Sequence, residues 1–271
     1  MKLDTSSYYP QSHLDDDDDD RDEIVEETVE VEETVEEIPE KVENTGDDGY
    51  ENRPDSSVPP TAAESYLNGV ATAISWVLVP LLMPVYGVLL AFNYSILDFT
   101  PFSVKLVFVL ITIATTMVVP SLLVLLLKRV GVVKDVGLNG RKERLIPYII
   151  SFVSMAGTGI FMWYKGAPLW LVMFFGGGAV AAIINLIVNF RWKISAHAAG
   201  IAGVVALMIR ILHDGFPQEG AFIWLIVSVV LAGLMGSARV WLGRHTVWQV
   251  IAGYAVGFTS VLLMTSIALS N

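Results

Sequence analysis

Two histidines in the apolar part of the chain have neighbours that suit anion chemistry. His197 follows Ser195 by two residues, and His245 follows Arg239 by six residues and precedes Gln249 by four. Imidazole can serve as a nucleophile or as a general acid and base, and guanidinium binds anionic oxygens with paired hydrogen bonds. We therefore expect these residues to form one anion-binding, chemically active site.

Each of the two histidines begins an apolar run that reads as a membrane-spanning helix. Helix N-termini present N–H groups without intrahelical partners and the positive end of the helix dipole, which suits a bound anion. An ionisable residue at or within the membrane usually has a function, because its burial there is costly. Considered alone, His197 could equally be an interface residue or a catalyst, and Arg239 could be a lipid headgroup anchor. The hypothesis of an active site therefore depends on the two histidines, Arg239 and Ser195 taken together.

The helices that must position these residues are predicted from long, continuous apolar runs without the alternation of transmembrane strands. We expect an all-α, polytopic transmembrane bundle over residues 65–271, with six or seven spans and seven preferred, because Pro80 and Pro84 interrupt the first run and the fifth is short. Trp163, Trp170 and Trp241 lie near run ends, as interface anchors do. The predicted spans are 66–92, 103–127, 145–164, 168–190, 197–212, 221–241 and 246–269.

Basic residues concentrate in three linkers that a seven-span chain places on one membrane face, the face of the N-terminus. They follow the second, fourth and sixth runs, whereas the opposite loops carry little charge. The positive-inside rule favours a cytoplasmic location for such a face, but bases that serve chemistry would weaken that inference. The sequence leaves the membrane and the face that bears the site open.

A strongly acidic segment precedes the apolar region. Residues 1–64 hold 23 of the 28 acidic residues and 4 of the 17 Lys and Arg residues, for a net charge of −19, while residues 65–271 carry +8. Like-charge repulsion and low apolar content predict a disordered tail over residues 1–64. The composition excludes a single soluble globular domain and argues against nucleic acid as a partner. Cysteine is absent, which excludes a thiolate site.

The spacing around His245 resembles the third motif of the type 2 phosphatidic-acid phosphatase superfamily, S-R-x-x-x-x-x-H-x-x-x-D. The distance from Arg239 to His245 matches, Ser237 lies one position too far from Arg239, and Gln249 replaces the Asp. The segment HTVWQVIAGYAVG is similar to the dolichyl-diphosphatase branch, in which a Gln occupies that position. The resemblance implies a membrane lipid phosphate phosphatase.

Two further motifs of the superfamily precede this one in the expected order. Ser195 and His197 match the second motif, P-S-G-H, although Pro and Gly are absent. Lys134 and Arg141 have the spacing of the first motif, K-x-x-x-x-x-x-R-P, but Lys142 follows instead of Pro. A second alignment of the first motif uses Arg144 and the nearby Pro147.

The resemblance implies a role for each matching residue. His245 would attack phosphorus and form a phosphohistidine, His197 would protonate the leaving oxygen and then help to activate water, and Gln249 would orient His245. No cofactor and no metal are expected in this scheme. The residues expected to bind the phosphoryl group are Lys134, Arg141, Arg144, Ser195 and Arg239.

The expected ligand is a phosphorylated or diphosphorylated lipid, such as a polyprenyl diphosphate, phosphatidate or phosphatidylglycerol phosphate. The absence of G-x-x-x-x-G-K-[ST] disfavours a kinase, and the lack of aspartate-rich motifs disfavours a membrane prenyltransferase. Because Gln249 supplies no charge, an inactive relative that binds or transports a phosphorylated lipid is the alternative. The sequence does not identify protein partners.

Overall fold

The computed structural model describes residues 60–131, 145–213 and 217–267, which fold into helices without any strand. Seven helical segments in these ranges are long and apolar enough to cross a bilayer. The prediction of an all-α, multi-pass membrane protein is confirmed, with the preferred count of seven spans. The main helices are α1 (Ala62–Val77), α2 (Met83–Tyr94), α3 (Phe102–Thr112), α4 (Val119–Arg129), α5 (Leu145–Tyr164), α6 (Leu169–Asn189), α7 (Ala196–His213), α8 (Ala221–Trp241) and α9 (Val247–Ile267).

The first span begins earlier than the sequence predicted. Thr61 is the N-cap of α1, and its hydroxyl accepts the N–H of Glu64 at 3.3 Å while the Glu64 carboxylate accepts the N–H of Thr61 at 2.8 Å. This capping box satisfies two backbone donors that would otherwise have no partner, so residues 62–64 join the helix instead of the predicted tail. The rest of that tail, residues 1–59, lies outside the described residues.

The two prolines of the first span divide it, as the sequence predicted. A single turn of 3-10 helix, η1 (Pro80–Leu82), separates α1 from α2, and Pro84 lies in the first turn of α2. The Tyr86 hydroxyl donates to the Val77 carbonyl at 2.9 Å, which satisfies a carbonyl at the break.

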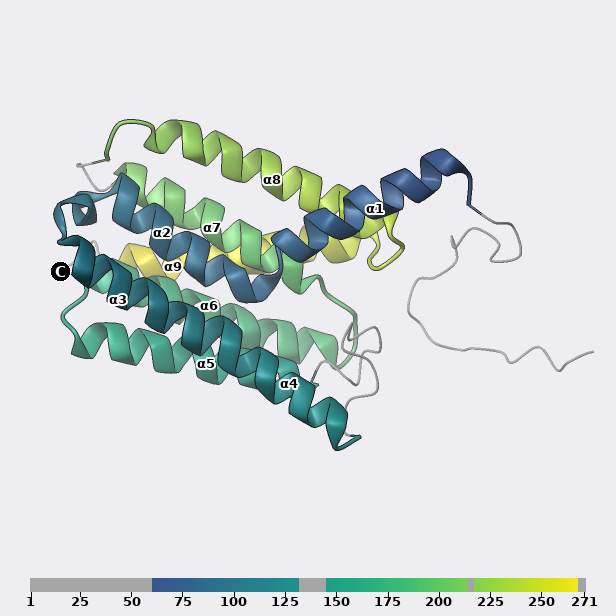
Figure 1. Ribbon diagram of the computed structural model, residues 1–271, viewed down its shortest axis with the longest axis horizontal. Helices are drawn as coiled ribbons and strands as arrows, with labels where there is room; N and C mark the ends of the chain where they lie inside the picture. The colour runs from purple at the N-terminus through teal and green to yellow at the C-terminus, as the bar shows by residue number, and fades with distance from the viewer. Residues whose placement is uncertain (1–59, 132–144, 214–216, 268–271) are drawn as a thin grey trace, which may run out of the picture. The chain divides into compact units, whose positions relative to one another are not determined.

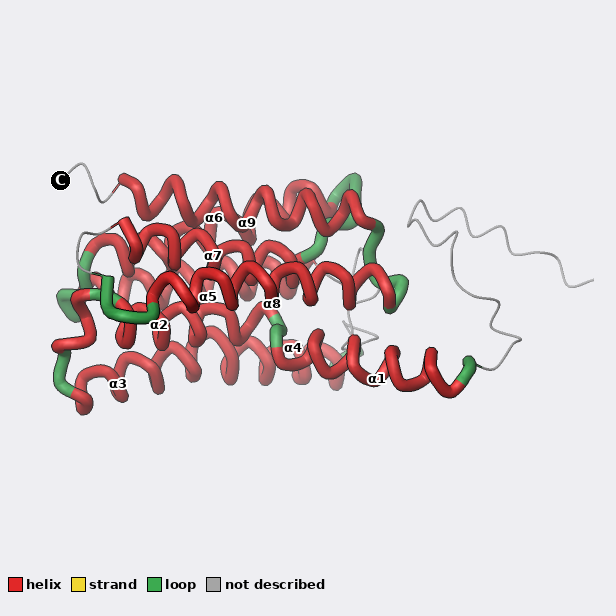
Figure 2. Tube along the Cα trace, turned by 90° about the horizontal axis from the view of Figure 1, so that it is seen from above, coloured by secondary structure: helices red, strands yellow, loops and turns green. Residues whose placement is uncertain are grey.

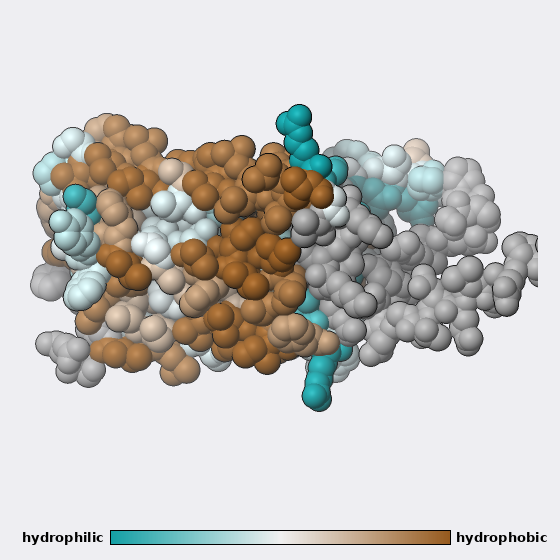
Figure 3. Space-filling model, turned by 90° about the horizontal axis from the view of Figure 1, so that it is seen from below, coloured by the Kyte–Doolittle hydropathy of each residue, from teal (hydrophilic) through white to brown (hydrophobic). Residues whose placement is uncertain are grey.

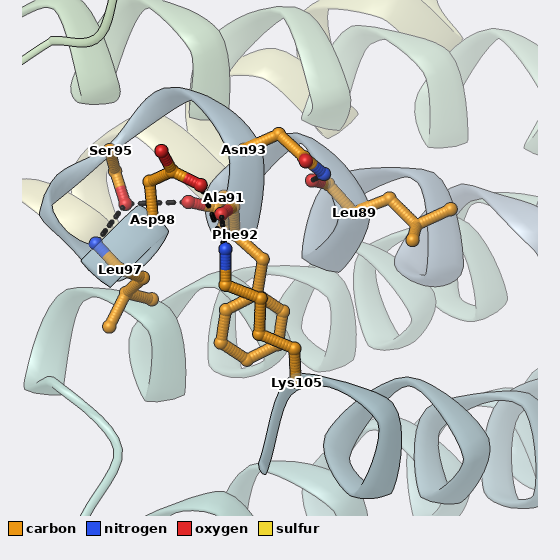
Figure 4. Close-up of polar contacts among 8 residues, drawn as sticks. All are labelled: Leu89, Ala91, Phe92, Asn93, Ser95, Leu97, Asp98 and Lys105. Carbon is orange, nitrogen blue, oxygen red and sulfur yellow. Dashed lines mark hydrogen bonds and ion pairs between the residues drawn. The ribbon is translucent and has the colours of Figure 1, made fainter. Parts of the chain in front are cut away.

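The second span contains a π-helical segment, η3 (Ile113–Val118), between α3 and α4. Before it, the turn η2 (Ile96–Phe99) connects α2 to α3. Figure 4 shows how this turn is fixed: the Lys105 ammonium lies 2.8 Å from the Asp98 carboxylate and 3.0 Å from the Phe92 carbonyl. Lys105 and Asp98 therefore form an ion pair that fixes this turn.

Helix α7 has the most buried span in the bundle. It packs against α9, α8 and α2, and α6 packs against both α5 and α9 (Figures 1 and 2). Hydrophobic side chains cover much of the described surface seen in Figure 3, and hydrophilic ones gather toward the ends of the helices. Exposed large apolar residues such as Trp76, Leu122 and Leu263 are what a lipid-facing surface requires.

Candidate active site

Helix α8 ends in a Schellman motif that turns the chain back toward its own last turn. Gly243 adopts a left-handed φ of 60°, and its N–H donates to the Val240 carbonyl at 2.9 Å. The N–H of Arg244 donates to the Arg239 carbonyl at 3.0 Å. These are the two hydrogen bonds of that motif, and glycine takes the left-handed position without a Cβ penalty.

The motif explains why five residues separate Arg239 from His245. The N–H of His245 also donates to the Arg239 carbonyl, at 3.3 Å. The reversal of the chain therefore brings the imidazole-bearing residue back to the end of the helix that carries the guanidinium. The spacing between Arg239 and His245 in the sequence thus corresponds to one tight turn in the structure.

A second capping box starts α9 immediately after His245. Thr246 precedes the helix, its hydroxyl accepts the N–H of Gln249 at 3.4 Å, and Gln249 Oε1 accepts the N–H of Thr246 at 3.3 Å. The pair follows the T-x-x-Q pattern of a capping box. The same Oε1 atom lies 3.0 Å from Nδ1 of His245, so one amide oxygen serves both the cap and the imidazole.

This double role determines the tautomer of His245. Only an oxygen can accept the Thr246 N–H, so the Gln249 atom that faces His245 is an acceptor. The Nδ1 atom of His245 must then carry the proton that it donates to this oxygen. In the neutral ring this leaves Nε2 with its lone pair, the form that a nucleophile or a base requires.

The N-terminus of α7 is docked onto the first turn of α9. The N–H of Ser195 donates to the Gln249 carbonyl at 3.2 Å, and the Ser195 hydroxyl accepts the N–H of Ala198 at 3.3 Å as a helix cap. His197 is the second residue of α7. Both proposed catalytic histidines therefore sit beside helix N-termini that a backbone hydrogen bond joins.

Two glycines of α9 allow this close approach. A Cβ on Gly253 would collide with the carbonyl of Ser195, and a Cβ on Gly257 would collide with the carbonyl of Ala199. The pair forms a G-x-x-x-G sequence, which lets helix backbones approach each other in a membrane. The close contact of α7 and α9 holds His197 in place relative to His245.

Five of the eight residues that the sequence predicted for the site lie at the ends of α7, α8 and α9 that backbone hydrogen bonds join. Ser195, His245 and Gln249 are buried, and His197 and Arg239 are half-buried. Burial in a low dielectric strengthens the interaction of these groups with an anion. The other three predicted residues, Lys134, Arg141 and Arg144, lie outside the described residues.

Residues 182–271 match the family model described as the PAP2 superfamily. This part of the chain is similar to the PAP2 superfamily. Comparisons of the chain with curated proteins and with solved structures found no match. The predicted resemblance to the type 2 phosphatidic-acid phosphatases is confirmed at the level of the superfamily, while the resemblance to the dolichyl-diphosphatase branch stays a prediction.

The PAP2 match covers the described part of the site. It extends from the end of α6 through α9 and includes the second and third motifs, with His197, Arg239, His245 and Gln249. The predicted first motif precedes the match. PAP2 proteins are generally phosphatases, which supports a lipid phosphatase within this helical membrane bundle.

Sequence reasoning missed two residues near the candidate active site. Thr246 completes the capping box that fixes Gln249, and the T-x-x-Q spacing could have revealed it. Lys193 lies two residues before Ser195 and is buried, with 2% of its surface exposed. The burial of Lys193 depends on how the helices pack and has no signal in the sequence.

A cavity of about 100 Å³ extends into the bundle from the start of α7. Ala196, which adjoins His197, lines it together with residues of α5, α6 and α9. Its polar lining includes Thr116, Tyr148 and Asn185. The candidate site therefore adjoins a small, mostly apolar cavity that carries a few polar side chains.

Proposed function

We propose that the protein is an integral-membrane lipid phosphatase that removes a phosphoryl group from a phosphorylated or diphosphorylated lipid through a phosphohistidine at His245. The observation that carries the proposal is the contact of His245 Nδ1 with Gln249 Oε1 at 3.0 Å. In the neutral imidazole this contact leaves the lone pair on Nε2, beside a helix N-terminus, where a bound phosphoryl group would lie.

In the first step, Nε2 of His245 attacks phosphorus and the bond from phosphorus to the lipid oxygen breaks. His197 donates a proton to that oxygen, so the lipid leaves as an alcohol or, from a diphosphate, as a monophosphate. Arg239, at the end of α8, binds the phosphoryl oxygens and stabilises the charge of the five-coordinate transition state. The helix N-termini of α7 and α9 add N–H groups and positive dipole ends.

In the second step, water attacks the phosphorus of the phosphohistidine and the P–N bond breaks. His197, now neutral, accepts the proton from that water, and inorganic phosphate leaves. Gln249 holds the Nδ1 proton of His245 in both steps and supports the imidazolium character that develops there. The scheme is metal-free and needs no cofactor, because Arg239 and the helix dipoles provide the positive charge.

The membrane setting supports a lipid as the substrate. Site residues lie at the ends of spans, where a headgroup meets the protein while its hydrocarbon remains in the bilayer. Acidic residues in the described ranges are Glu64, Asp98 and Glu219, and none belongs to α7 or α9. The described part of the site therefore offers an anionic headgroup positive charge without a repelling carboxylate from these two helices.

The experiment is phosphate release from a panel of lipid phosphates and diphosphates by the purified protein in detergent micelles. We expect His245→Ala to lower kcat by roughly 10⁴-fold or more, because the nucleophile is removed. His213→Ala is the matched control, because His213 lies at the opposite end of α7 and is exposed. Equal release by wild type and His245→Ala would refute the assignment.

The same panel tests the alternative of a non-catalytic lipid-phosphate binder. If neither protein hydrolyses any lipid and both retain a phospholipid through purification, the chain is an inactive relative that binds or transports lipid. Gln249 in place of the motif's Asp is the residue that favours this alternative.

A further inference from the structure

Two hollow spaces adjoin different faces of α7, and their chemistry differs. The cavity beside Ala196 and Ala199 has a volume of about 100 Å³, whereas a groove beside Ile201 and Val204 has a volume of about 690 Å³. The groove lies between α1, α2, α7 and α8. Ligand sites commonly fall in the range of 300–1,000 Å³, so the groove is large enough for a lipid chain and the cavity is not.

The smaller cavity also holds a buried polar atom that hydrocarbon would not satisfy. Asn185, with 3% of its surface exposed, presents a buried Oδ1 atom that accepts no hydrogen bond from the described residues. An apolar chain would leave this carbonyl oxygen without a partner, at a desolvation cost that water would remove. The cavity therefore suits water or a hydroxyl group.

The groove, in contrast, has an apolar lining that comes from four helices. Ile74 from α1 and Leu89 from α2 form one side, and Ile201 from α7 and Leu231 and Leu234 from α8 form the other. Such a surface gains free energy in proportion to the apolar area that it covers, without directional requirements. The lining thus favours a flexible hydrocarbon chain over a polar ligand.

Two polar side chains of the groove, Asn93 and Ser228, have hydrogen-bond partners. The Asn93 amide donates to the Leu89 carbonyl at 2.7 Å, as Figure 4 shows. The Ser228 hydroxyl donates to the Trp224 carbonyl at 2.7 Å. These bonds are local to each helix, so neither side chain requires a polar group from a ligand.

The groove starts close to the candidate active site. Ile201 lies four residues after His197 on α7, and Leu234 lies five residues before Arg239 on α8. It continues along α8 to Trp224, ten residues from Leu234, which corresponds to about 15 Å along the helix. A chain attached to a headgroup at the site would thus run along the spans toward the opposite face.

Helix α1 forms one wall of the groove. The Trp241 indole N–H donates to the Asn68 side chain at 3.0 Å, which joins α1 to the end of α8. At the far end, the rings of Tyr94 and Trp224 lie 5.8 Å apart. The groove therefore has a wall that is fixed to the helix carrying Arg239 and an aromatic pair at its far limit.

We propose that this groove binds the hydrocarbon chain of the same lipid whose phosphate is processed at His245. The inference rests on the proposed function, since it assigns the chain of that substrate and not a bulk bilayer lipid. Binding in the groove makes the enzyme selective for lipids with long chains, because a chain that fills the groove out to Trp224 contributes apolar contacts that a short chain lacks.

The test fills the groove and compares substrates of two chain lengths. Leu231→Trp places an indole in the groove, and Val230→Trp, on the exposed lipid-facing side of the same helix, is the matched control. With dioleoyl phosphatidate in micelles we expect Leu231→Trp to lower kcat/KM at least 10-fold, with less than a 2-fold change for dihexanoyl phosphatidate. Val230→Trp should leave kcat/KM for both lipids unchanged. An equal loss with both lipids, or no loss with dioleoyl phosphatidate, would overturn the proposal.

Photo-cross-linking tests the groove without requiring catalysis. A phosphatidate with a diazirine in one C18 chain should label residues of α7 and α8 within the groove of the full-length protein, including an inactive one. Excess dioleoyl phosphatidate should suppress this labelling and phosphatidylcholine with the same chains should not. Labelling without any phosphatase activity would reject the proposed function alone, while equal suppression by both lipids would reject the groove as a substrate site.

Discussion

Nδ1 of His245 lies 3.0 Å from Oε1 of Gln249, and that oxygen also accepts the N–H of Thr246 at 3.3 Å. The amide that replaces the motif's carboxylate is therefore held by the start of its own helix. This arrangement orients the imidazole and fixes its tautomer without a negative charge. Gln249 is thus placed where it could orient His245, and the role that the resemblance implies for this position stays a prediction.

Substitutions of Gln249 distinguish the effect of orienting the His245 ring from the effect of a negative charge beside it. Gln249→Glu keeps an acceptor at the same reach and adds a carboxylate that stabilises the imidazolium, so we expect kcat to be retained or raised. Gln249→Leu removes the acceptor, and loss of the correct tautomer should lower kcat by about 10²–10⁴-fold. The measurement is phosphate release by each purified variant. Full activity of Gln249→Leu would show that this contact has no catalytic role.

Gly243 tests the turn that sets the spacing of Arg239 and His245. Gly243→Ala forces a Cβ into a left-handed conformation, which we expect to cost about 1 kcal/mol of stability and to displace His245. Gly233→Ala, on the open surface of α8, is the control and should leave stability unchanged or raise it. Thermal melts and kcat report the two effects. Identical behaviour of the two variants would contradict the role of the turn.

Asn185 tests whether a buried amide oxygen without a protein partner costs stability at the small cavity. Because its Oδ1 accepts no hydrogen bond from the described residues, Asn185→Leu should leave stability unchanged or raise it by about 1–3 kcal/mol. The reason is that the apolar side chain removes a buried group that lacks a protein partner. Thermal unfolding in detergent measures the effect. A large fall in the melting temperature would indicate that Asn185 makes a structural contact.

Cysteine labelling tests the seven-span topology, since the native chain has no cysteine. Lys165 lies between α5 and α6, and Arg191 lies between α6 and α7; both are exposed. Lys165→Cys and Arg191→Cys should react with a membrane-impermeant maleimide from opposite sides of sealed vesicles. Reaction of both from the same side would contradict the number of spans between them.

The spans could be predicted from the sequence because continuous apolar runs of this length have few other interpretations. The structure places α5 at the predicted residues 145–164 and α8 at the predicted residues 221–241. Two local details differed. The capping box of Thr61 and Glu64 starts the first span before residue 65, and Trp170 is only 7% exposed, although a position near a run end predicted an interface anchor. Its ring lies 6.0 Å from the Arg210 guanidinium, which covers it.

The site was predictable only in part, for a physical reason. The spacing of Arg239 and His245 follows from one local turn, so the sequence carries it. The hydrogen bond from Ser195 to the Gln249 carbonyl joins helices that are distant along the chain, and no local pattern encodes it. The same holds for the burial of Lys193 and for the two spaces on either face of α7, because these depend on how helices pack.

The most direct test of the central claim is the detection of the phosphoenzyme. The purified protein would be mixed with ³²P-labelled lipid phosphate, quenched within milliseconds in alkali and analysed by gel and by peptide mass spectrometry. We predict an acid-labile, alkali-stable phosphate on His245, which His245→Ala lacks and His213→Ala retains. Turnover of the lipid without label at His245, or with label on His245→Ala, would contradict the proposed mechanism.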